Sequence, residues 1–278
     1  MRKIFAAGIL LLMILGGAYL ARPESNRTNQ TNPLKIIFLD VGQGDSILFI
    51  LPNGNTLLID GGPDTQTDWL LQNYISPYFC RVNMVLLTHP QADHLAGLQR
   101  VAEHCHIDMI FQNLVSYDSF MYKNWLSTSK KFHNLKLFAG SSFSVSNVDF
   151  YTVWPPESLE DKNVNNHSLS LFVDFGTFEA LFTGDLEGEM QPELQKNLES
   201  LSGLIDRPFE LFKAPHHGAA NGLNRDLVSW LKPEVFVVSV GAKNTYGHPN
   251  QEVLDFLEEL GAKVFRTDKD GTVEISVR

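Results

Sequence analysis

The 278-residue chain has few cysteines, few basic residues and almost no long apolar runs. The one run that approaches the span of a bilayer is Ile4 to Ala21 at the N-terminus, so the sequence lacks the array of membrane helices that a DNA channel would need. Lys and Arg number 22 against 32 Asp and Glu, which gives a net charge of −10 at pH 7. A surface field of this sign repels nucleic acid, so a polynucleotide would have to be held by a local basic strip or by bound metal ions.

The scarcity of cysteine limits the covalent cross-links to a single pair, Cys80 and Cys105. Each ends a helix-like segment just before a predicted strand, and consecutive strands of a βαβ unit usually lie side by side. In an exported chain this favours a disulfide; the alternative is two buried free thiols. A third interpretation, a metal site at His104-Cys105-His106, requires a backbone turn that brings the three side chains together.

The N-terminus has the pattern of an export signal. Arg2-Lys3 precedes an apolar core, and Gly16-Gly17-Ala18 offers small residues for cleavage after Ala18. The same run is of borderline length for a membrane helix, so residues 1–21 are either a signal peptide or an N-terminal anchor. No cysteine follows the core, which argues against a lipoprotein. Residues 22–33 are polar and aperiodic, as in a flexible tether, and we expect the domain to be extracytoplasmic: periplasmic, secreted or anchored.

Residues 34–278 have the size and composition of one large α/β domain. Helical periodicity alternates with strand-like apolar runs and hairpin signals. The expected strands are 34–39, 46–51, 56–59, 82–87, 107–111, 145–153, 169–175, 178–182, 209–213, 235–240, 264–266 and 272–277. The expected helices are 66–74, 95–103, 116–133, 187–201, 224–230 and 251–260. Their order predicts an αββα sandwich, in which two mixed sheets pack together with helices outside.

The segment that carries the most chemistry is Thr88-His89-Pro90-Gln91-Ala92-Asp93-His94, directly after a predicted strand. The strand fixes the backbone, and the following turn can direct two imidazoles and a carboxylate into one pocket. Neutral imidazole and carboxylate together suit zinc, manganese or iron.

Other acidic and histidine residues also follow predicted strands. Each alone has an ordinary explanation, because Asp after a strand is usually a turn former and a lone His is usually a surface or core residue. Their recurrence beside glycine indicates a site at one sheet edge, since glycine lets the backbone approach a ligand closely. These residues are Asp60, Asp185, His216, His217 and His248.

Seven ordered motifs resemble the metallo-β-lactamase superfamily, and in particular the extracytoplasmic domain of ComEC competence proteins. The resemblance covers about residues 35–277 and implies the metallo-β-lactamase fold with a two-metal site. The motifs are Asp40-Val41-Gly42-Gln43-Gly44-Asp45, Leu58-Ile59-Asp60-Gly61-Gly62, Thr88 to His94, Asn165-Asn166-His167-Ser168-Leu169, Thr183-Gly184-Asp185, Ala214-Pro215-His216-His217-Gly218 and Tyr246-Gly247-His248-Pro249.

The resemblance implies a role for each matching residue. His89 would bind a first metal; Asp93, His94 and His216 would bind a second, and Asp185 would bridge the two. Asp60 would orient a ligand histidine. His217 and His248 would face the substrate, and with Asp93 they are the expected catalytic residues. By contrast, the carboxylates of Asp40 and Asp45 are expected to hold the first turn together.

Three departures from the superfamily pattern concern mainly the first metal position. Gln91 stands where many members have His and ComEC proteins often have Asp; an amide is a poor zinc ligand, although its oxygen can bind a hard cation. In the fourth motif, His167 is a candidate ligand, or it simply flanks Asn165. Ala219 replaces the serine of the ComEC motif. The second metal position, with Asp93, His94, Asp185 and His216, keeps all of its expected ligands.

The sequence therefore predicts an exported hydrolase that uses one or two divalent ions, zinc or manganese, to activate water. The expected substrate is a phosphodiester, single- or double-stranded DNA, and the expected membrane contact is a tether through the N-terminus. The sequence indicates no protein partner. Two alternatives remain: hydrolysis of a lactone, thioester or β-lactam, and a non-catalytic binding module with a degenerate first metal site.

Overall fold

The computed structural model describes residues 32–278. The expected signal peptide or anchor, and all of the expected linker except residues 32 and 33, lie outside this range. Within it, no helix is both long enough and apolar enough to span a membrane.

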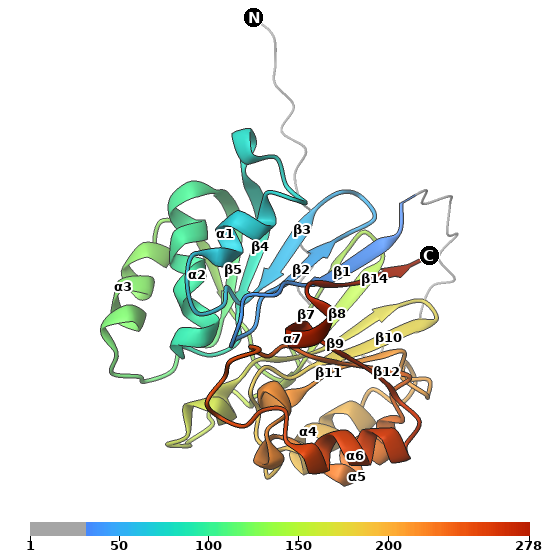
Figure 1. The fold of residues 1–278 in the computed structure, drawn as a ribbon. Coiled ribbons are helices and arrows are strands. Elements are labelled where there is room, and N and C mark those ends of the chain that lie inside the picture. Colours follow the sequence, from blue (N-terminus) through green and yellow to red (C-terminus); the bar gives the residue numbers. More distant parts are fainter. Residues whose placement is uncertain (1–31) are drawn as a thin grey trace, which may run out of the picture.

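Two seven-stranded sheets form the centre of the fold (Figure 1). Edge to edge, the first contains Val273–Val277 (β14), Leu34–Phe38 (β1), Ile47–Ile50 (β2), Thr56–Ile59 (β3), Arg81–Leu87 (β4), His106–Gln112 (β5) and His133–Lys136 (β6). The second contains Lys263–Arg266 (β13), Val235–Val238 (β12), Leu211–Lys213 (β11), Phe178–Phe182 (β10), Ser170–Phe175 (β9), Val148–Trp154 (β8) and Ser142–Val145 (β7). Each sheet is mixed: β3 to β6 and β10 to β13 run parallel, and the other neighbours are antiparallel.

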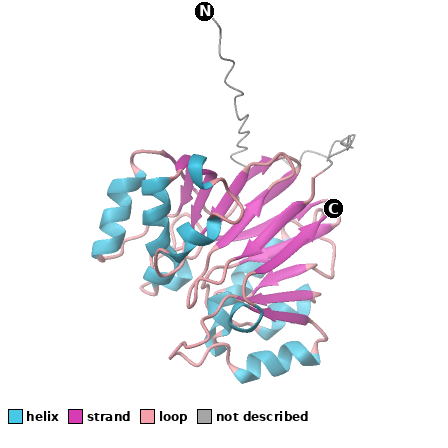
Figure 2. Ribbon diagram, turned by 45° about the horizontal axis from the view of Figure 1, so that its top comes forward, coloured by secondary structure: helices cyan, strands magenta, loops and turns pink. Residues whose placement is uncertain are grey.

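Helices cover the outer faces of both sheets, which completes the αββα sandwich that the sequence predicts and confirms the expected fold (Figure 2). The first sheet carries Gln66–Leu71 (α1), Ala92–His104 (α2) and Phe120–Ser129 (α3). The second carries Gln191–Glu199 (α4), Arg225–Leu231 (α5) and Gln251–Glu259 (α6), and a single turn, Thr267–Asp270 (α7), precedes β14. Short 3-10 turns form at Pro77–Phe79 (η1), Val164–His167 (η2), Pro215–Gly218 (η3) and Ala220–Gly222 (η4).

Alternation along the strands explains how one chain supplies three apolar layers. In β1, Ile36 and Phe38 enter the core between the sheets, whereas Ile37 points to the core beneath α1 to α3. In β10, Ala180 lies in the central core and Leu181 in the core beneath α4 to α6. Strands buried on both faces read as continuous apolar runs, which is why they are recognisable in the sequence.

Two strand regions differ from the sequence expectation, and α7 forms where neither a helix nor a strand was expected. The expected strand 145–153 is a hairpin, because Ser146 and Asn147 take positive φ values of 56° and 62° and turn β7 into β8. Strand β6 lies within the region expected to be helical or unassigned; its sequence, His133 to Lys136, is polar and mostly exposed, so it lacks the apolar alternation that identifies a strand.

Cys80 and Cys105 form a disulfide, which decides between the alternatives that the sequence leaves open. The bond joins the end of η1 to the end of α2, and the His106 amide donates to the Cys80 carbonyl at 2.9 Å. The His104-Cys105-His106 metal site is excluded, because His104 pairs with Asp68 and His106 with Asp108.

Replacing both cysteines by alanine should lower the free energy of unfolding by about 3 kcal/mol, because the bond closes a loop of 25 residues in the unfolded chain. Urea unfolding of the variant and of the wild type measures the loss. Reducing the wild type with dithiothreitol should shift its midpoint to that of the variant. A variant as stable as the oxidised wild type would contradict the expectation.

A second stability prediction concerns Glu179, a buried carboxyl group in β10. Its Oε1 accepts a hydrogen bond from the Asp206 amide at 2.7 Å, but burial and the nearby carboxylates of Asp174 and Glu210 raise its pKa to about 7. The folded protein therefore holds a proton that the unfolded chain releases near pH 4.5. Stability should fall as the pH rises from 4.5 to 7 and should then level off.

Glu179→Gln removes this titration and keeps an acceptor for the Asp206 amide. We expect the variant to unfold at a higher temperature than the wild type at pH 8 and to show no gain at pH 4.5. Glu258→Gln, on the exposed face of α6, is the matched control and should change neither value. Equal effects of the two substitutions at both pH values would contradict the assignment.

Candidate metal centre

The carboxyl ends of the parallel strands from both sheets meet at one edge of the sandwich. Asp60 follows β3, Thr88 and His89 follow β4, and the segments after β10 and β11 come alongside. The His216 amide donates to the Gly184 carbonyl at 3.2 Å, which joins the last two segments. The topology therefore gathers polar residues from distant parts of the sequence into one place.

Close backbone packing sets the start of α2 against the turn after β3. A Cβ on Gly97 would lie 1.8 Å from the Gly61 carbonyl oxygen, so only glycine permits this contact. It brings His94, in the first turn of α2, against Asp60: His94 Nδ1 lies 2.7 Å from Asp60 Oδ2. The Thr88 amide and hydroxyl donate to the same carboxyl group at 2.8 and 2.6 Å. Asp60 thus fixes the His94 ring with its Nε2 atom free.

Four side chains converge beside Asp60: Asp93, His94, Asp185 and His217. One possible ligand atom from each lies within 4.8 Å of all the others. Asp185 Oδ2 is 3.2 Å from His94 Nε2 and 3.4 Å from His217 Nε2, and His217 Nε2 is 3.4 Å from Asp93 Oδ2. Two imidazole nitrogens and two carboxylates form a donor set that suits zinc or manganese.

The hydrogen-bonding state of these atoms fits a divalent ion. His94 Nε2, His217 Nε2 and both carboxylate oxygens of Asp185 are buried and have no hydrogen-bond partner among residues 32–278. Buried polar atoms are rarely left unpaired in a folded protein. The opposite nitrogens are engaged, His94 Nδ1 by Asp60 and His217 Nδ1 by the Ser239 carbonyl at 2.9 Å. The two Nε2 lone pairs are therefore available to a metal.

The electrostatic potential in the pocket is negative and would also stabilise a bound cation. Burial opposes a charge on His94, but the carboxylates of Asp185 and Asp60 outweigh it and hold its pKa well above the ordinary value. At His217, burial is likewise outweighed, in this case by Asp185, Asp45 and Asp93, and the pKa is again well above the ordinary value. Both shifts show an excess of negative charge that a divalent ion would neutralise.

The expected roles of the two consecutive histidines are corrected by the structure. His217, not His216, is the fourth member of the group, whereas His216 Nε2 lies 4.0 Å from Asp185 Oδ2 with its side chain 21% exposed. Both residues have left-handed backbone conformations, with φ of 46° and 54°. This tight turn buries the second ring and leaves the first at the rim. Such strain in non-glycine residues is typical of functional sites.

Asp45 does more than hold its own turn, contrary to the sequence expectation. It is fully buried, its Oδ2 pairs with the ammonium of Lys213, and its Oδ1 lies 3.5 Å from His217 Nδ1. Lys213 has no role in the sequence motifs, yet its Nζ also lies 3.1 Å from the Gly184 carbonyl oxygen and 3.8 Å from Asp185 Oδ1. Lys213 ends an apolar strand, and a lysine in such a position indicates a buried ammonium group that needs a carboxylate partner.

The residues expected at a first metal position are only partly assembled. His89 Nε2 lies 3.2 Å from Gln91 Oε1, and the His89 and His94 ring centroids are 4.2 Å apart. Burial and the neighbouring His94 lower the pKa of His89 to about 3, so its imidazole is neutral. His89 is thus adjacent to the four-residue group but does not belong to it, and the Gln91 amide contacts His89.

His167 does not reach this pocket, which corrects its assignment as a metal ligand. It ends η2 and its Nε2 is 3.0 Å from the Asp161 carbonyl oxygen. The next residue, Ser168, faces the site instead: its hydroxyl lies 3.3 Å from His89 Nδ1 and accepts from the Asp185 amide at 3.1 Å. In the motif Asn165 to Leu169 the sequence leaves open which residue faces the site. The structure shows that it is Ser168, one residue after His167.

His216 and His248 form the rim of the site, with ring centroids 5.7 Å apart. The Tyr246 ring stacks on His248 at 6.0 Å and is largely exposed. Burial and the neighbouring His216 and His217 lower the pKa of His248. Of the four grouped residues, only Asp93 has a substantially accessible side chain, at 31%. Asp93, His216 and His248 thus mark the side from which a substrate can approach.

Comparison with known proteins identifies the family of the chain. The family model described as the beta-lactamase superfamily domain matches residues 55–206, more than half of the chain. The chain therefore belongs to the β-lactamase superfamily.

Within that class, the chain is related to ComEC-type competence proteins, as the sequence motifs suggest. It is 25% identical to ComE operon protein 3 of Bacillus subtilis over 261 residues, which cover 86% of this chain and 32% of the relative. It is 26% identical to recombination protein 2 of Haemophilus influenzae (86% and 28% coverage) and 25% identical to competence protein ComA of Neisseria gonorrhoeae (96% and 35%). The chain spans about a third of the length of these relatives.

Solved structures share the fold at low identity. The diiron β-hydroxylase CmlA of Streptomyces venezuelae superposes with a TM-score of 0.60 at 14% identity, covering 90% of this chain and 55% of CmlA. Tm1679, a metal-dependent hydrolase of the superfamily, gives 0.57 at 11% identity, and a diphosphatase of the PhnP family gives 0.53 at 12%. For both, the match covers 88% of this chain and 99% of the other.

Asp60→Asn should weaken binding of zinc or manganese by about 10- to 100-fold, because the carboxylate that orients His94 is lost. Titration calorimetry on metal-free protein measures the change. His167→Ala is the control and should leave the affinity unchanged. A loss with His167→Ala as large as that with Asp60→Asn would contradict the placement of both residues.

Proposed function

We propose that this protein is a metal-dependent phosphodiesterase that hydrolyses DNA outside the cytoplasm. The observation that carries the proposal is the convergence of Asp93, His94, Asp185 and His217, with buried atoms left unpaired, beside a rim of two histidines. A divalent ion held there would lower the pKa of water and offset the charge that develops on a phosphate. The names of the relatives, competence and recombination proteins, point to DNA as the substrate.

The side chains around the ion would have separate roles in metal binding, substrate binding and charge compensation. His94 and His217 would hold the ion through Nε2, because Asp60 and the Ser239 carbonyl engage their Nδ1 atoms. Asp93 and Asp185 would supply oxygen ligands. His216 and His248, at the rim, would donate hydrogen bonds to a phosphate oxygen or a proton to the leaving oxygen. Lys213 would compensate the charge of Asp45 and keep that carboxylate next to His217.

The geometry favours one resident ion over two. A carboxylate can bridge two metals through one oxygen or through both, but the Lys213 ammonium, 3.8 Å from Asp185 Oδ1, already places a positive charge on that side of the carboxylate. A second position beside His89 would add only one imidazole and the amide oxygen of Gln91. A metal content near one equivalent in protein loaded with zinc or manganese supports this. Two equivalents would contradict it, and much less than one would favour a non-catalytic binding module.

The disulfide supports the proposed location. Disulfides such as Cys80–Cys105 persist in oxidising compartments and are rare in the cytosol. Together with the apolar N-terminal run in the sequence, this favours a periplasmic, secreted or membrane-anchored domain.

The two consecutive histidines provide the sharpest test of function. His217→Ala should lose both the bound metal and phosphodiester hydrolysis. His216→Ala should retain the metal and lower kcat by about 100-fold, the usual contribution of a positioned proton donor. The measurements are metal content and cleavage of single-stranded DNA in the presence of Mn²⁺ or Zn²⁺. The reverse pattern would refute the assignment, and turnover of a lactone or chromogenic β-lactam without DNA cleavage would refute the substrate class.

A further inference from the structure

A second distinctive surface lies at the edge of the first sheet opposite the metal centre. Because β3, β4, β5 and β6 run parallel, their amino ends meet there, just as their carboxyl ends meet at the site. We call this surface the amino-end face and define it by the four segments that lead into these strands: 52–55, 76–81, 104–106 and 130–133.

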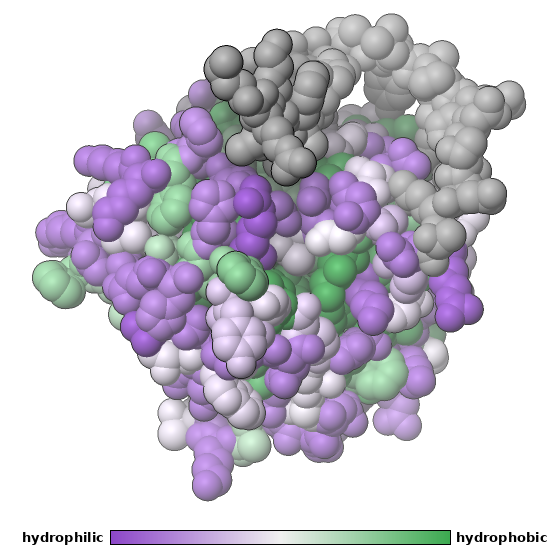
Figure 3. Space-filling model, turned by 90° about the horizontal axis from the view of Figure 1, so that it is seen from above, coloured by the Kyte–Doolittle hydropathy of each residue, from purple (hydrophilic) through white to green (hydrophobic). Residues whose placement is uncertain are grey.

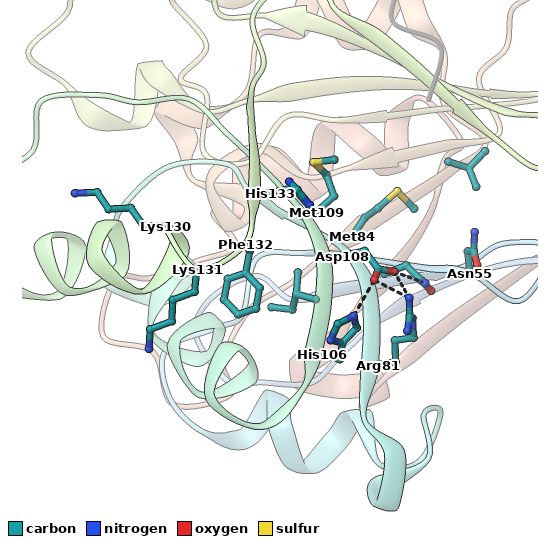
Figure 4. A pocket seen from close by; sticks show the side chains of 13 residues that line it. Asn55, Arg81, Met84, His106, Asp108, Met109, Lys130, Lys131, Phe132 and His133 are labelled. Atoms are coloured by element: carbon teal, nitrogen blue, oxygen red, sulfur yellow. Dashed lines mark hydrogen bonds and ion pairs between the residues drawn. The ribbon is translucent and has the colours of Figure 1, made fainter. Parts of the chain in front are cut away.

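A cavity of about 860 Å³ opens on the amino-end face. Met84, Ile107, Met109, Phe132 and Val145 line its apolar part, and Arg81, His106, Lys130, Lys131 and His133 contribute cationic or titratable groups (Figure 4). Figure 3 looks down on this side of the molecule and shows a hydrophobic hollow between hydrophilic side chains. The face thus combines an apolar depression with a basic margin.

Two adjacent aromatic side chains project from η1, which precedes Arg81 of the cavity lining. Tyr78 and Phe79, in η1, are 89% and 84% exposed, and η1 stands out from the fold above α1 (Figure 1). The neighbouring Cys80 ties the base of this projection to the end of α2. A pair of large aromatic side chains held outward on a fixed turn is costly in water, and it is characteristic of a surface that meets a membrane or a partner.

Charge on this face departs from that of the whole protein. The chain carries −10, yet Lys130 and Lys131 stand next to each other at the margin of the cavity and are exposed. Within residues 32–278 neither has an ion-pair partner. Asp108 is the acidic residue that lines the cavity, and both its oxygens accept hydrogen bonds from Arg81, at 2.6 and 2.8 Å. The two lysines are therefore free to meet anionic groups.

The path of the chain places this face near the proposed anchor. Asn32 Nδ2 donates to the Pro52 carbonyl at 3.2 Å, and Asn55 of the same hairpin lines the cavity. The ten residues 22–31 separate Asn32 from the apolar run. A stretch of that length spans at most about 35 Å. If residues 1–21 anchor the protein, the amino-end face lies within that reach of the lipid.

We propose that the amino-end face docks on an anionic phospholipid surface. Tyr78 and Phe79 enter the headgroup region, while Lys130 and Lys131 contact lipid phosphates. The metal centre, at the opposite ends of the same strands, then faces away from the bilayer and toward incoming substrate. The inference depends on the proposed anchoring and is independent of the proposed hydrolysis.

The test uses the full chain reconstituted into vesicles of phosphatidylcholine, with or without phosphatidylglycerol, and in detergent. Hydrogen–deuterium exchange should slow in 76–81 and 130–133 on the phosphatidylglycerol vesicles, and the slowing should be lost at high salt. Exchange in the metal-site loop 244–249 should be the same in all three samples. Each lysine that faces an anionic surface should contribute about fivefold to docking, so Lys130→Gln with Lys131→Gln should weaken it about 25-fold.

Tyr78→Ser with Phe79→Ser should also abolish the slowing, while leaving the disulfide and DNA cleavage intact. Phe120→Ser is the matched control: this side chain is 89% exposed at the start of α3, which follows the carboxyl end of β5 at the opposite edge. It should leave the exchange pattern unchanged. Asp185→Ala should stop hydrolysis without altering docking, so failure of the proposed function and failure of docking can be told apart.

Several outcomes would overturn the proposal. One is vesicle-bound protein whose 76–81 and 130–133 segments exchange as fast as in detergent. Another is equal slowing with and without phosphatidylglycerol, which would remove the role of the lysines. A third is a doubled mass in detergent that Tyr78→Ser with Phe79→Ser abolishes, since the face would then bind a second copy of the chain. Protein that fails to sediment with any vesicle would instead refute the anchoring on which the inference depends.

Discussion

The organisation of this protein depends on an excess of buried negative charge at one edge of the sandwich. The buried Asp45, Asp60 and Asp185 and the partly exposed Asp93 surround two imidazoles and a single ammonium group, that of Lys213. Carboxylates are buried only when they are paired or bind a metal. The hydrogen bonds to Asp60, the strained turn after β11 and the close backbone packing at Gly61 all serve to hold these charges around a common point.

Much of this was predictable because the signals are local. Buried strands read as continuous apolar runs, and a strand followed by Asp or His marks a site at its carboxyl end whether or not its neighbours are known. The positions of Asp93, His94 and Asp185 after strands predict that they lie at one edge, and the family resemblance adds the expectation that they share a metal. Edge strand β6 was not, because its polar residues pack against no second layer.

What the sequence could not supply is the direction of each side chain. His216 and His217 differ by one position, and only the left-handed turn decides which ring is buried. The same holds for His167 and Ser168, where the last residue of η2 turns away. Asp45 and Lys213 are 168 positions apart and meet because β11 of the second sheet ends beside the turn after β1 in the first. A contact between two sheets produces no pattern of hydrophobic periodicity in the sequence around either residue.

The first and last strands of the domain pair with each other, Leu34 opposite Val277. The polypeptide therefore enters and leaves the fold at neighbouring points of one sheet. A module with adjacent ends can be joined to other segments, or carried inside a longer polypeptide, without straining either junction. The relatives carry a comparable region within chains about three times as long, which is consistent with this property. Both ends of the domain lie away from the metal centre, so a joined segment would leave the metal centre accessible.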